Sequence, residues 1–265
     1  MAIVNVTPDS FYSGSRNLSA ADVEQRVRRA VEQGASIIDI GGYSSRPGAA
    51  EVPVDEEWRR VDMGLQVAGR VAPGVAVSVD TFRSEIVRRA VDSHGAIIVN
   101  DISAGELDSD MLAAVAEAGV PYIAMHMRGT PASMQQMTDY RRDIVSEVVD
   151  YFRNKIDEMI SAGIDRSNII LDPGFGFAKT LEQNYCLMHS LDRLVALGYP
   201  VLSGISRKSM IYRLLDITPE ESLCGTSVLN WVSLEKGASI LRVHDVREAM
   251  QVVKMFETYD KFRHI

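Results

Sequence analysis

Residues 77–100, VSVDTFRSEIVRRAVDSHGAIIVN, contain the pattern on which the chain is built. One apolar run ends at Asp80, a helix-like segment follows over residues 83–92, and a second apolar run ends at Asn100. Short apolar runs that alternate with amphipathic helices are typical of parallel strands buried on both faces. This stretch therefore predicts a strand, a helix and a second, parallel strand.

The pattern occurs along the whole chain. Eight apolar runs cover residues 3–5, 37–40, 77–80, 97–100, 122–126, 169–172, 201–206 and 240–244. Eight such units in 265 residues match the size and strand count of a (β/α)₈ barrel. We predict an α/β protein, a (β/α)₈ TIM barrel with a single domain over residues 1–265. The first run begins almost at Met1, so we expect little chain before the barrel in this sequence.

Helix signals separate the apolar runs. Ser19 is a suitable N-cap for the first helix, and Gly34 a suitable stop. We expect helices over residues 19–33, 56–70, 83–92, 110–118, 139–162, 180–197, 209–215, 219–236 and 246–262. The loops over residues 7–17, 41–54 and 128–138 are longer than a barrel needs, which is typical of lids and binding loops.

Composition limits the possible partners and the compartment. The formal net charge of −8 disfavours nucleic acid and anionic membranes as partners. No apolar stretch approaches the length of a membrane span, and no signal peptide is visible. Cys186 and Cys224 lack metal-like spacing, and we expect them to be small buried apolar residues of helices. A reducing cytoplasm fits this cysteine usage.

Polar residues end most of the predicted strands. In a barrel the strand C-termini form the active face, so we expect a common mouth for Asn5, Asp80, Asn100, Asp172, Lys208, Arg242 and His244. The carboxylates of Asp80 and Asp172 need a partner or a ligand when they are partly buried. The alternative for each is a helix N-cap. Asn100 can both donate and accept hydrogen bonds, which suits a heterocycle, although a turn residue would look the same.

A cationic pocket is predicted after the last two strands, where barrels often bind phosphate. Lys208, Arg242 and His244 would form it; a structural ion pair with Asp245 or a neighbour is the alternative for the last two. His126 lies between two methionines, where a packed histidine is as plausible as a functional one. Asp39 points away from the side chains of its apolar neighbours and would support the barrel interior, without a catalytic role.

Seven motifs, in order, resemble those of the dihydropteroate synthase family, within the pterin-binding barrel superfamily, and the match covers nearly the whole chain. They are residues 5–11 (NVTPDSF), 41–48 (GGYSSRPG), 78–81 (SVDT), 99–101 (VND), 172–179 (DPGFGFAK), 206–209 (SRKS) and 242–245 (RVHD). This family joins 6-hydroxymethyl-7,8-dihydropterin diphosphate to p-aminobenzoate, giving 7,8-dihydropteroate and pyrophosphate.

The resemblance implies a role for each matching residue. The pterin would be held by Asp80, Asn100, Asp172 and Lys208. The diphosphate would be held by Asn5, Arg46, Arg242 and His244, with Mg²⁺ on Asn5. The p-aminobenzoate site would be bordered by Phe11, Ser45, Pro47, Lys208 and Ser209. Catalysis would depend on Asp80, Lys208 and Arg242. Family members are commonly homodimers.

Two positions depart from the family pattern. Tyr43 stands where the family usually has Glu, and Ser45 where it usually has Thr. One alternative function is a methyltetrahydrofolate-corrinoid methyltransferase, which shares the barrel but has no need for a diphosphate pocket. The other is a non-catalytic pterin-binding paralogue.

Overall fold

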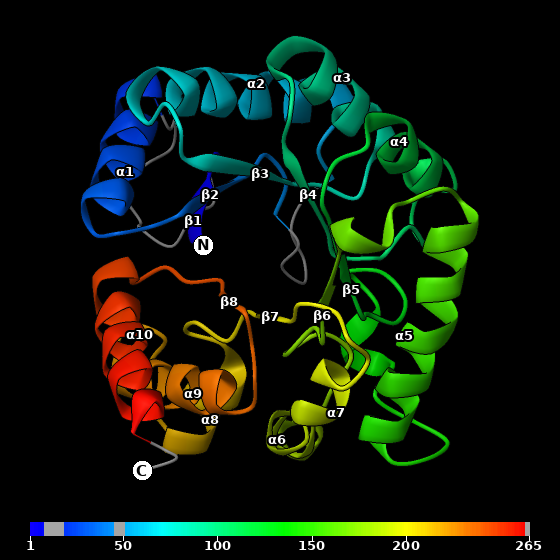
Figure 1. Cartoon of the computed structure of the whole chain (residues 1–265), viewed down its shortest axis with the longest axis vertical. Coiled ribbons are helices and arrows are strands. Elements are labelled where there is room, and N and C mark those ends of the chain that lie inside the picture. The colour runs from blue at the N-terminus through cyan, green and yellow to red at the C-terminus, as the bar shows by residue number, and fades with distance from the viewer. Residues whose placement is uncertain (8–18, 45–50, 263–265) are drawn as a thin grey trace.

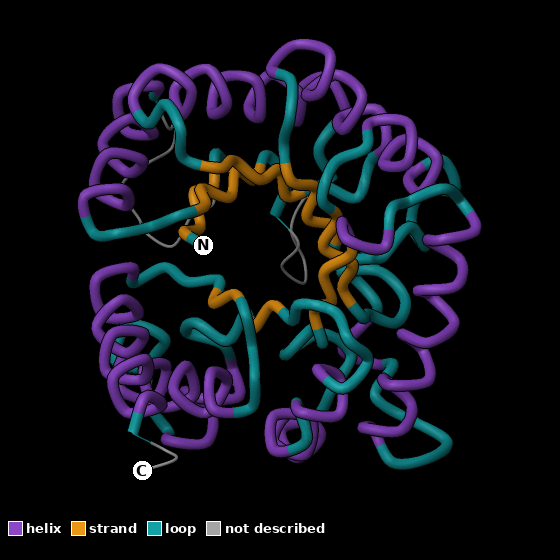
Figure 2. The backbone as a smooth tube through the Cα atoms, viewed as in Figure 1, coloured by secondary structure: helices purple, strands orange, loops and turns teal. Residues whose placement is uncertain are grey.

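Eight short parallel strands form the centre of the molecule in a computed structural model that describes residues 1–7, 19–44 and 51–262. Figure 2 shows the strands as an inner ring with the helices outside it. The strands are β1 (Ala2–Asn5), β2 (Ile37–Gly41), β3 (Ala76–Asp80), β4 (Ile98–Asp101), β5 (Tyr122–Met125), β6 (Ile169–Asp172), β7 (Leu202–Ser203) and β8 (Ile240–Leu241).

Backbone hydrogen bonds close the ring. Strands β1 to β6 form one parallel sheet in chain order, and β7 pairs in parallel with β8. Parallel bridges from Leu171 to Val201 and from Ala2 to Val243 join the two sheets on both sides. At the second junction the amide of Ile3 donates to the carbonyl of Val243 over 3.0 Å. The predicted (β/α)₈ barrel is therefore confirmed.

The helices surround the strands, as Figure 1 shows. They are α1 (Ala20–Glu32), α2 (Val54–Val71), α3 (Ser84–His94), α4 (Met111–Ala118), α5 (Ile144–Ser161), α6 (Leu181–His189), α7 (Asp192–Val195), α8 (Ser209–Leu215), α9 (Leu223–Glu235) and α10 (Val246–Lys261). Short 3-10 turns lie at Met134–Gln136 and Arg166–Asn168. Most of the longer helices bury one apolar stripe against the strands, as Val23, Val27 and Ala30 do in α1.

Capping residues set several helix ends. Ser19 is the N-cap of α1, as predicted, and it forms a capping box with Asp22. The helix predicted from residue 139 begins only at Ile144, because the side chain of Asp143 accepts from the amide of Ser146 and caps it there. The helix predicted over residues 180–197 is divided into α6 and α7. The break at Ser190 lets Leu191 and Leu194 both face the core, where each is fully buried.

The prediction that the two cysteines are buried was wrong. Cys186 in α6 and Cys224 in α9 are helical as expected, but both are exposed, because each lies on the outer side of its helix. No helix within the described residues is long and apolar enough to cross a membrane.

Candidate active site

A cavity of about 730 Å³ opens at the carboxyl ends of the strands. The cavity is lined by six of the residues that the sequence predicted at the mouth or at the p-aminobenzoate site: Asn5, Asp80, Lys208, Ser209, Arg242 and His244. Asn100 and Asp172 also end their strands but are buried, with 4% and 5% of their surfaces exposed. The parallel strands thus bring residues from distant parts of the chain to one end of the barrel.

Arg242 joins two carboxylates at the floor of this cavity. Its Nε donates to Asp39 over 2.7 Å, and its Nη2 donates to Asp80 over 2.5 Å. Asp39 is fully buried, and the amide of Asn100 donates to both of its oxygens over 3.3 and 3.4 Å. Asp39 therefore orients two of the predicted site residues from inside the barrel.

Burial and charge act against each other at Asp80. Burial raises the pKa of this carboxyl group to about 7, and the Arg242 guanidinium limits the rise. The neighbouring carboxylates raise the pKa of Arg242, so it stays protonated. A carboxyl group that loses its proton only as the pH rises through about 7 is thus held beside a permanent cation.

Asp172 and Lys208 form the opposite side of the floor. Asp172 Oδ1 accepts from the amide of Gly174 over 2.7 Å. Burial raises the pKa of Asp172, while the charge of Lys208 opposes the rise. Lys208 donates to the carbonyl of Phe175 over 2.5 Å, and its Nζ lies 4.7 Å from the centre of the Phe177 ring. Burial lowers the pKa of Lys208 to about 8.

The two residues that follow β8 reach different partners within the cavity. Arg242 points to Asp39 and Asp80, whereas His244 Nδ1 lies 3.1 Å from the hydroxyl of Ser206. The structural ion pair considered as the alternative for Arg242 exists, but with Asp39 and Asp80. Asp245 is instead paired with Arg207, at 2.8 and 2.9 Å. Arg207 thereby anchors the segment after β7 to the start of α10.

Tyr43, which departs from the family pattern, lines the cavity. Its ring packs edge-on against Phe82, with 5.0 Å between centroids, and the Arg83 guanidinium lies 5.3 Å from it. Its neighbours are therefore an aromatic ring and a cation. Four predicted site residues lie outside the described residues, and their roles stay predictions: Phe11, Ser45, Arg46 and Pro47.

Asn5 is suited to a hard cation. Its Oδ1 lies 3.2 Å, and Asp80 Oδ2 lies 3.7 Å, from the point where a Cβ on Gly41 would stand, so both oxygens face the same small space. No cluster of three His, Cys, Asp or Glu ligands occurs in the described part of the chain. A single amide oxygen fits Mg²⁺, which commonly takes its remaining ligands from water and substrate phosphates.

Two residues near the site have contacts that the sequence did not predict. Asp39 was expected only to support the barrel, although a charged residue inside an apolar run was a visible signal. Lys179 closes one of the quoted motifs, yet it was not recognised as a buried cation. Only the fold shows what these two residues contact.

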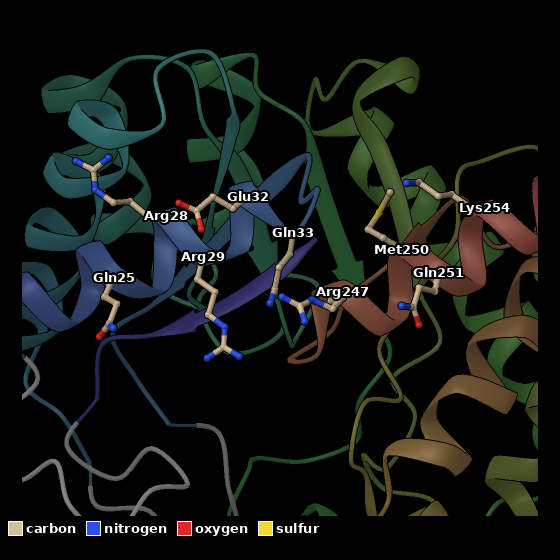
Figure 3. A pocket seen from close by; sticks show the side chains of 9 residues that line it. All are labelled: Gln25, Arg28, Arg29, Glu32, Gln33, Arg247, Met250, Gln251 and Lys254. Atoms are coloured by element: carbon tan, nitrogen blue, oxygen red, sulfur yellow. The ribbon is translucent and has the colours of Figure 1, made fainter.

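A second cavity, of about 770 Å³, lies between α1 and α10 on the outside of the barrel (Figure 3). Its walls carry Arg29, Gln33, Arg247 and Lys254 among other residues. None of the residues predicted for the mouth lines it. The strand-end cavity is therefore the candidate active site.

Known proteins match this architecture and its motifs. Residues 1–244 match the model of the pterin binding enzyme family. The dihydropteroate synthase of Escherichia coli strain K12 is 42% identical over 259 residues, which are 97% of this chain and 90% of the relative. The chain belongs to the dihydropteroate synthase family. The family predicted from the seven motifs is thus confirmed.

Other dihydropteroate synthases extend the comparison. The enzyme of Synechocystis sp. is 42% identical over 96% of this chain and 88% of the relative. The Yersinia pestis enzyme, solved as a sulfonamide drug complex, has a TM-score of 0.92 at 36% identity over 98% of this chain and 93% of its own. The Xanthomonas albilineans enzyme, solved with 4-aminobenzoic acid, has a TM-score of 0.87 at 37% identity over 100% and 92% of the two chains.

Proposed function

We propose that this chain condenses 6-hydroxymethyl-7,8-dihydropterin diphosphate with p-aminobenzoate, giving 7,8-dihydropteroate and pyrophosphate. The observation that carries the proposal is the floor of the strand-end cavity. There Asp172 and Asn100 are buried, beside Lys208 and the charge cluster of Arg242 and Asp80. Buried hydrogen-bonding groups suit a flat heterocycle, and a cationic wall suits a diphosphate.

The pterin ring would lie over the buried polar groups. The Asp172 carboxylate accepts from ring N–H groups, and Asn100 both donates and accepts. Phe177 and the Lys208 stem cover the ring, since that ammonium already lies against the aromatic face of Phe177. These contacts orient the exocyclic CH₂–O bond toward the diphosphate side of the cavity.

The diphosphate would be bound by His244, Arg46 and the outer edge of Arg242, with Asn5 holding Mg²⁺. The metal supplies positive charge that neutralises the departing diphosphate oxygens. His244 and Arg242 both line the cavity, which supports their placement near this group.

Catalysis then separates charge along one bond. The C–O bond to the diphosphate breaks, and the pterin CH₂ becomes cationic. Asp80 stabilises that cation when ionised, and Arg242 and Lys208 favour the developing negative charge of the leaving group. The p-aminobenzoate nitrogen forms the new C–N bond at this carbon and releases a proton. Phe11, Ser45, Pro47, Lys208 and Ser209 would border the amine that attacks.

Pyrophosphate release tests the reaction. The protein is mixed with the pterin diphosphate, p-aminobenzoate and Mg²⁺, and stoichiometric pyrophosphate and dihydropteroate are expected. A methyltetrahydrofolate-corrinoid methyltransferase would instead demethylate methyltetrahydrofolate without releasing pyrophosphate. A non-catalytic paralogue would bind the pterin without turnover, and either result refutes the proposal.

A homodimer is also proposed, through α9 and α10. These helices pack together and expose Val228, Met255, Tyr259 and Phe262, each more than half exposed. Trp231 lies between Phe256 and Tyr259, with ring centroids 5.5 and 5.4 Å away, so the apolar groups form one surface. Contiguous apolar surface of this kind marks association sites. A cytoplasmic location is proposed from the two unpaired cysteines.

A further inference from the structure

Lys179 is a buried cation whose partners are almost all backbone atoms. It is 4% exposed; the charge of Asp172 acts on it, but its hydrogen bonds among the described residues go to backbone carbonyls and to His126. Its Nζ donates to the carbonyls of Gly174 and Phe177, both over 2.9 Å, and lies 3.0 Å from Nδ1 of His126. The carbonyl of His126 is a more distant acceptor at 3.4 Å. The three shortest contacts match the three N–H groups of an ammonium.

His126 is arranged to accept from Lys179. Burial, with the charges of Lys179 and Arg128, holds the pKa of His126 well below its usual range, so the ring is neutral. A neutral imidazole can keep Nδ1 free of a proton and accept there. The rings of Tyr140 and Tyr151 pack against His126 and fix its orientation, with centroids 6.2 and 4.8 Å away.

The segment that Lys179 holds has a positive φ at three positions, and one of them is not a glycine. Gly174, Gly176 and Ala178 have φ values of +66°, +81° and +51°, a region that L residues such as Ala178 rarely adopt. A Cβ on Gly174 would stand 2.1 Å from the carbonyl of His126, so the segment passes very close to the end of β5. Buried hydrogen bonds must therefore maintain this conformation.

The same segment presents the groups assigned to the pterin. The amide of Gly174 orients the Asp172 carboxylate, and the carbonyl of Phe175 holds Lys208. The Phe177 ring lies against the Lys208 ammonium. A change in the path of residues 173–178 would displace these groups together.

We propose that Lys179, oriented by its contact with Nδ1 of His126, is a positioning residue that fixes residues 173–178 and thereby shapes the pterin site. It acts through Asp172 and Lys208 and does not touch the substrate. The inference rests on the proposed function only for the identity of the ligand.

The test compares Lys179→Met with wild type and with Lys155→Met. Lys155 on α5 is a matched control because it is also nearly buried, at 7% exposed, but bonds Glu158 over 2.6 Å and does not line the cavity. Isothermal titration with 6-hydroxymethylpterin should show Lys179→Met weakening affinity by about ten-fold or more. The KM for p-aminobenzoate at saturating pterin diphosphate should change much less than the pterin affinity, because Lys208 is the only displaced group that also borders the p-aminobenzoate site. Lys155→Met should lower the melting temperature but keep wild-type pterin affinity.

A pair of variants at His126 tests the same contact without changing the lysine. His126→Leu removes the acceptor and should weaken pterin binding. His126→Asn offers an amide oxygen near the position of Nδ1 and should restore much of the affinity. If Lys179→Met does not fold, the two His126 variants provide the test. The proposal is overturned if both of them bind the pterin as tightly as wild type.

Hydrogen exchange separates this inference from the proposed function. The amides of Gly174 and Gly176 bond the side chains of Asp172 and Asn184, each over 2.7 Å, and should exchange faster in Lys179→Met. If the wild-type protein does not bind pterin, the proposed function is refuted. Hydrogen exchange then still tests whether Lys179 fixes residues 173–178. Wild-type affinity and wild-type exchange in folded Lys179→Met overturn the positioning role.

Discussion

Among the single residues of the site, Arg242 balances the negative charges at the floor of the cavity. One guanidinium satisfies two carboxylates, Asp39 and Asp80, that come from different strands. Removing one member of a buried ion pair leaves an uncompensated charge, which costs much more than the pair itself contributes. Arg242 therefore has a structural role besides the one proposed toward the diphosphate, and His244 lies against the hydroxyl of Ser206.

Substitution at these two positions should separate the roles. Arg242→Ala and His244→Ala should both weaken binding of the pterin diphosphate more than binding of the unphosphorylated pterin. Arg242→Ala should also lower the free energy of unfolding by about 3–5 kcal/mol, because Asp39 and Asp80 lose their partner. Calorimetry with both ligands and urea denaturation measure these effects. Equal weakening of both ligands by His244→Ala would place the anion pocket elsewhere.

Asp172→Asn should weaken pterin binding while the fold stays intact. The substitution keeps the shape of the side chain but removes a charged acceptor, a loss of about 1.5–3 kcal/mol of binding free energy. Titration of a pterin analogue gives the affinity, and circular dichroism gives the fold. Unchanged affinity would remove Asp172 from the pterin site.

The pH dependence of kcat/KM should show a maximum between about 7 and 8. Burial raises the pKa of Asp80 to about 7, so its negative charge is lost as the pH falls through that value. Burial lowers the pKa of Lys208 to about 8, so its positive charge is lost as the pH rises through that value. The rate should therefore decrease on both sides.

Lys208→Arg identifies the alkaline limb of this profile. Burial lowers the pKa of Lys179 to about 7, so Lys179 loses charge over part of the same range. Arginine stays protonated throughout, so Lys208→Arg should move the alkaline limb to higher pH. If the alkaline limb stays at the same pH in this variant, the titration of another group causes it.

At the scale of elements, strand ends and the segments after them carry the site. The strands hold Asn5, Asp80 and Asn100 in register, since Gly41 pairs with both Asn5 and Asp80, and Asp80 pairs with Asn100. The segment after β6 is held by Lys179, and the segment after β7 by the pairing of Arg207 with Asp245. Two further segments predicted to bind substrate contain residues 8–18 and 45–50, which lie outside the described residues.

Sulfonamide binding should depend on Mg²⁺ and pyrophosphate. Residues 7–17 and 41–54 are rich in Gly, Pro and Ser, with few apolar residues to pack on their own. Mg²⁺ on Asn5 and an anion at Arg46 would order them into the p-aminobenzoate site. Titration of a sulfonamide, which mimics p-aminobenzoate, should give much tighter binding with Mg²⁺-pyrophosphate present. Equal affinity in both conditions would mean that the site is preformed.

In the molecule as a whole, closure of the barrel brings site residues from the first and last strands together. The bridge between Ala2 and Val243 places β1 beside β8, so Asn5 and Arg242 line one cavity although 237 positions separate them in the sequence. Closure also places α9 and α10 side by side on the outside, where their apolar residues form the proposed dimer surface.

A charged substitution on that surface should produce monomers. Val228 and Met255 flank the ring cluster of Trp231 and Tyr259 at helical spacings of three and four residues. The double variant Val228→Asp, Met255→Asp should shift the mass measured by light scattering from dimer to monomer. Met137→Asp, at an exposed apolar residue after β5, is the matched control and should leave the mass unchanged.

The fold class, the family and most residues at the mouth could be predicted from the amino-acid sequence alone. Apolar runs of strand length can be buried on both faces only in a parallel sheet covered by helices, and eight of them close a barrel. The polar residue at the end of each run then lies at the same end of the barrel, whichever part of the chain it comes from. Asp80, Asn100 and Asp172 could therefore be placed without coordinates.

The partners of the charged groups could not be predicted from the sequence, because they depend on how the strands and helices pack. The contact between Arg242 and Asp39 spans 203 positions, and that between Lys179 and His126 spans 53. The sequence shows which residues end strands, but it does not show which side chains face each other across the ring. Desolvation also depends on everything packed around a group, so the lowered pKa of Lys179 and the raised pKa of Asp80 follow from the fold alone.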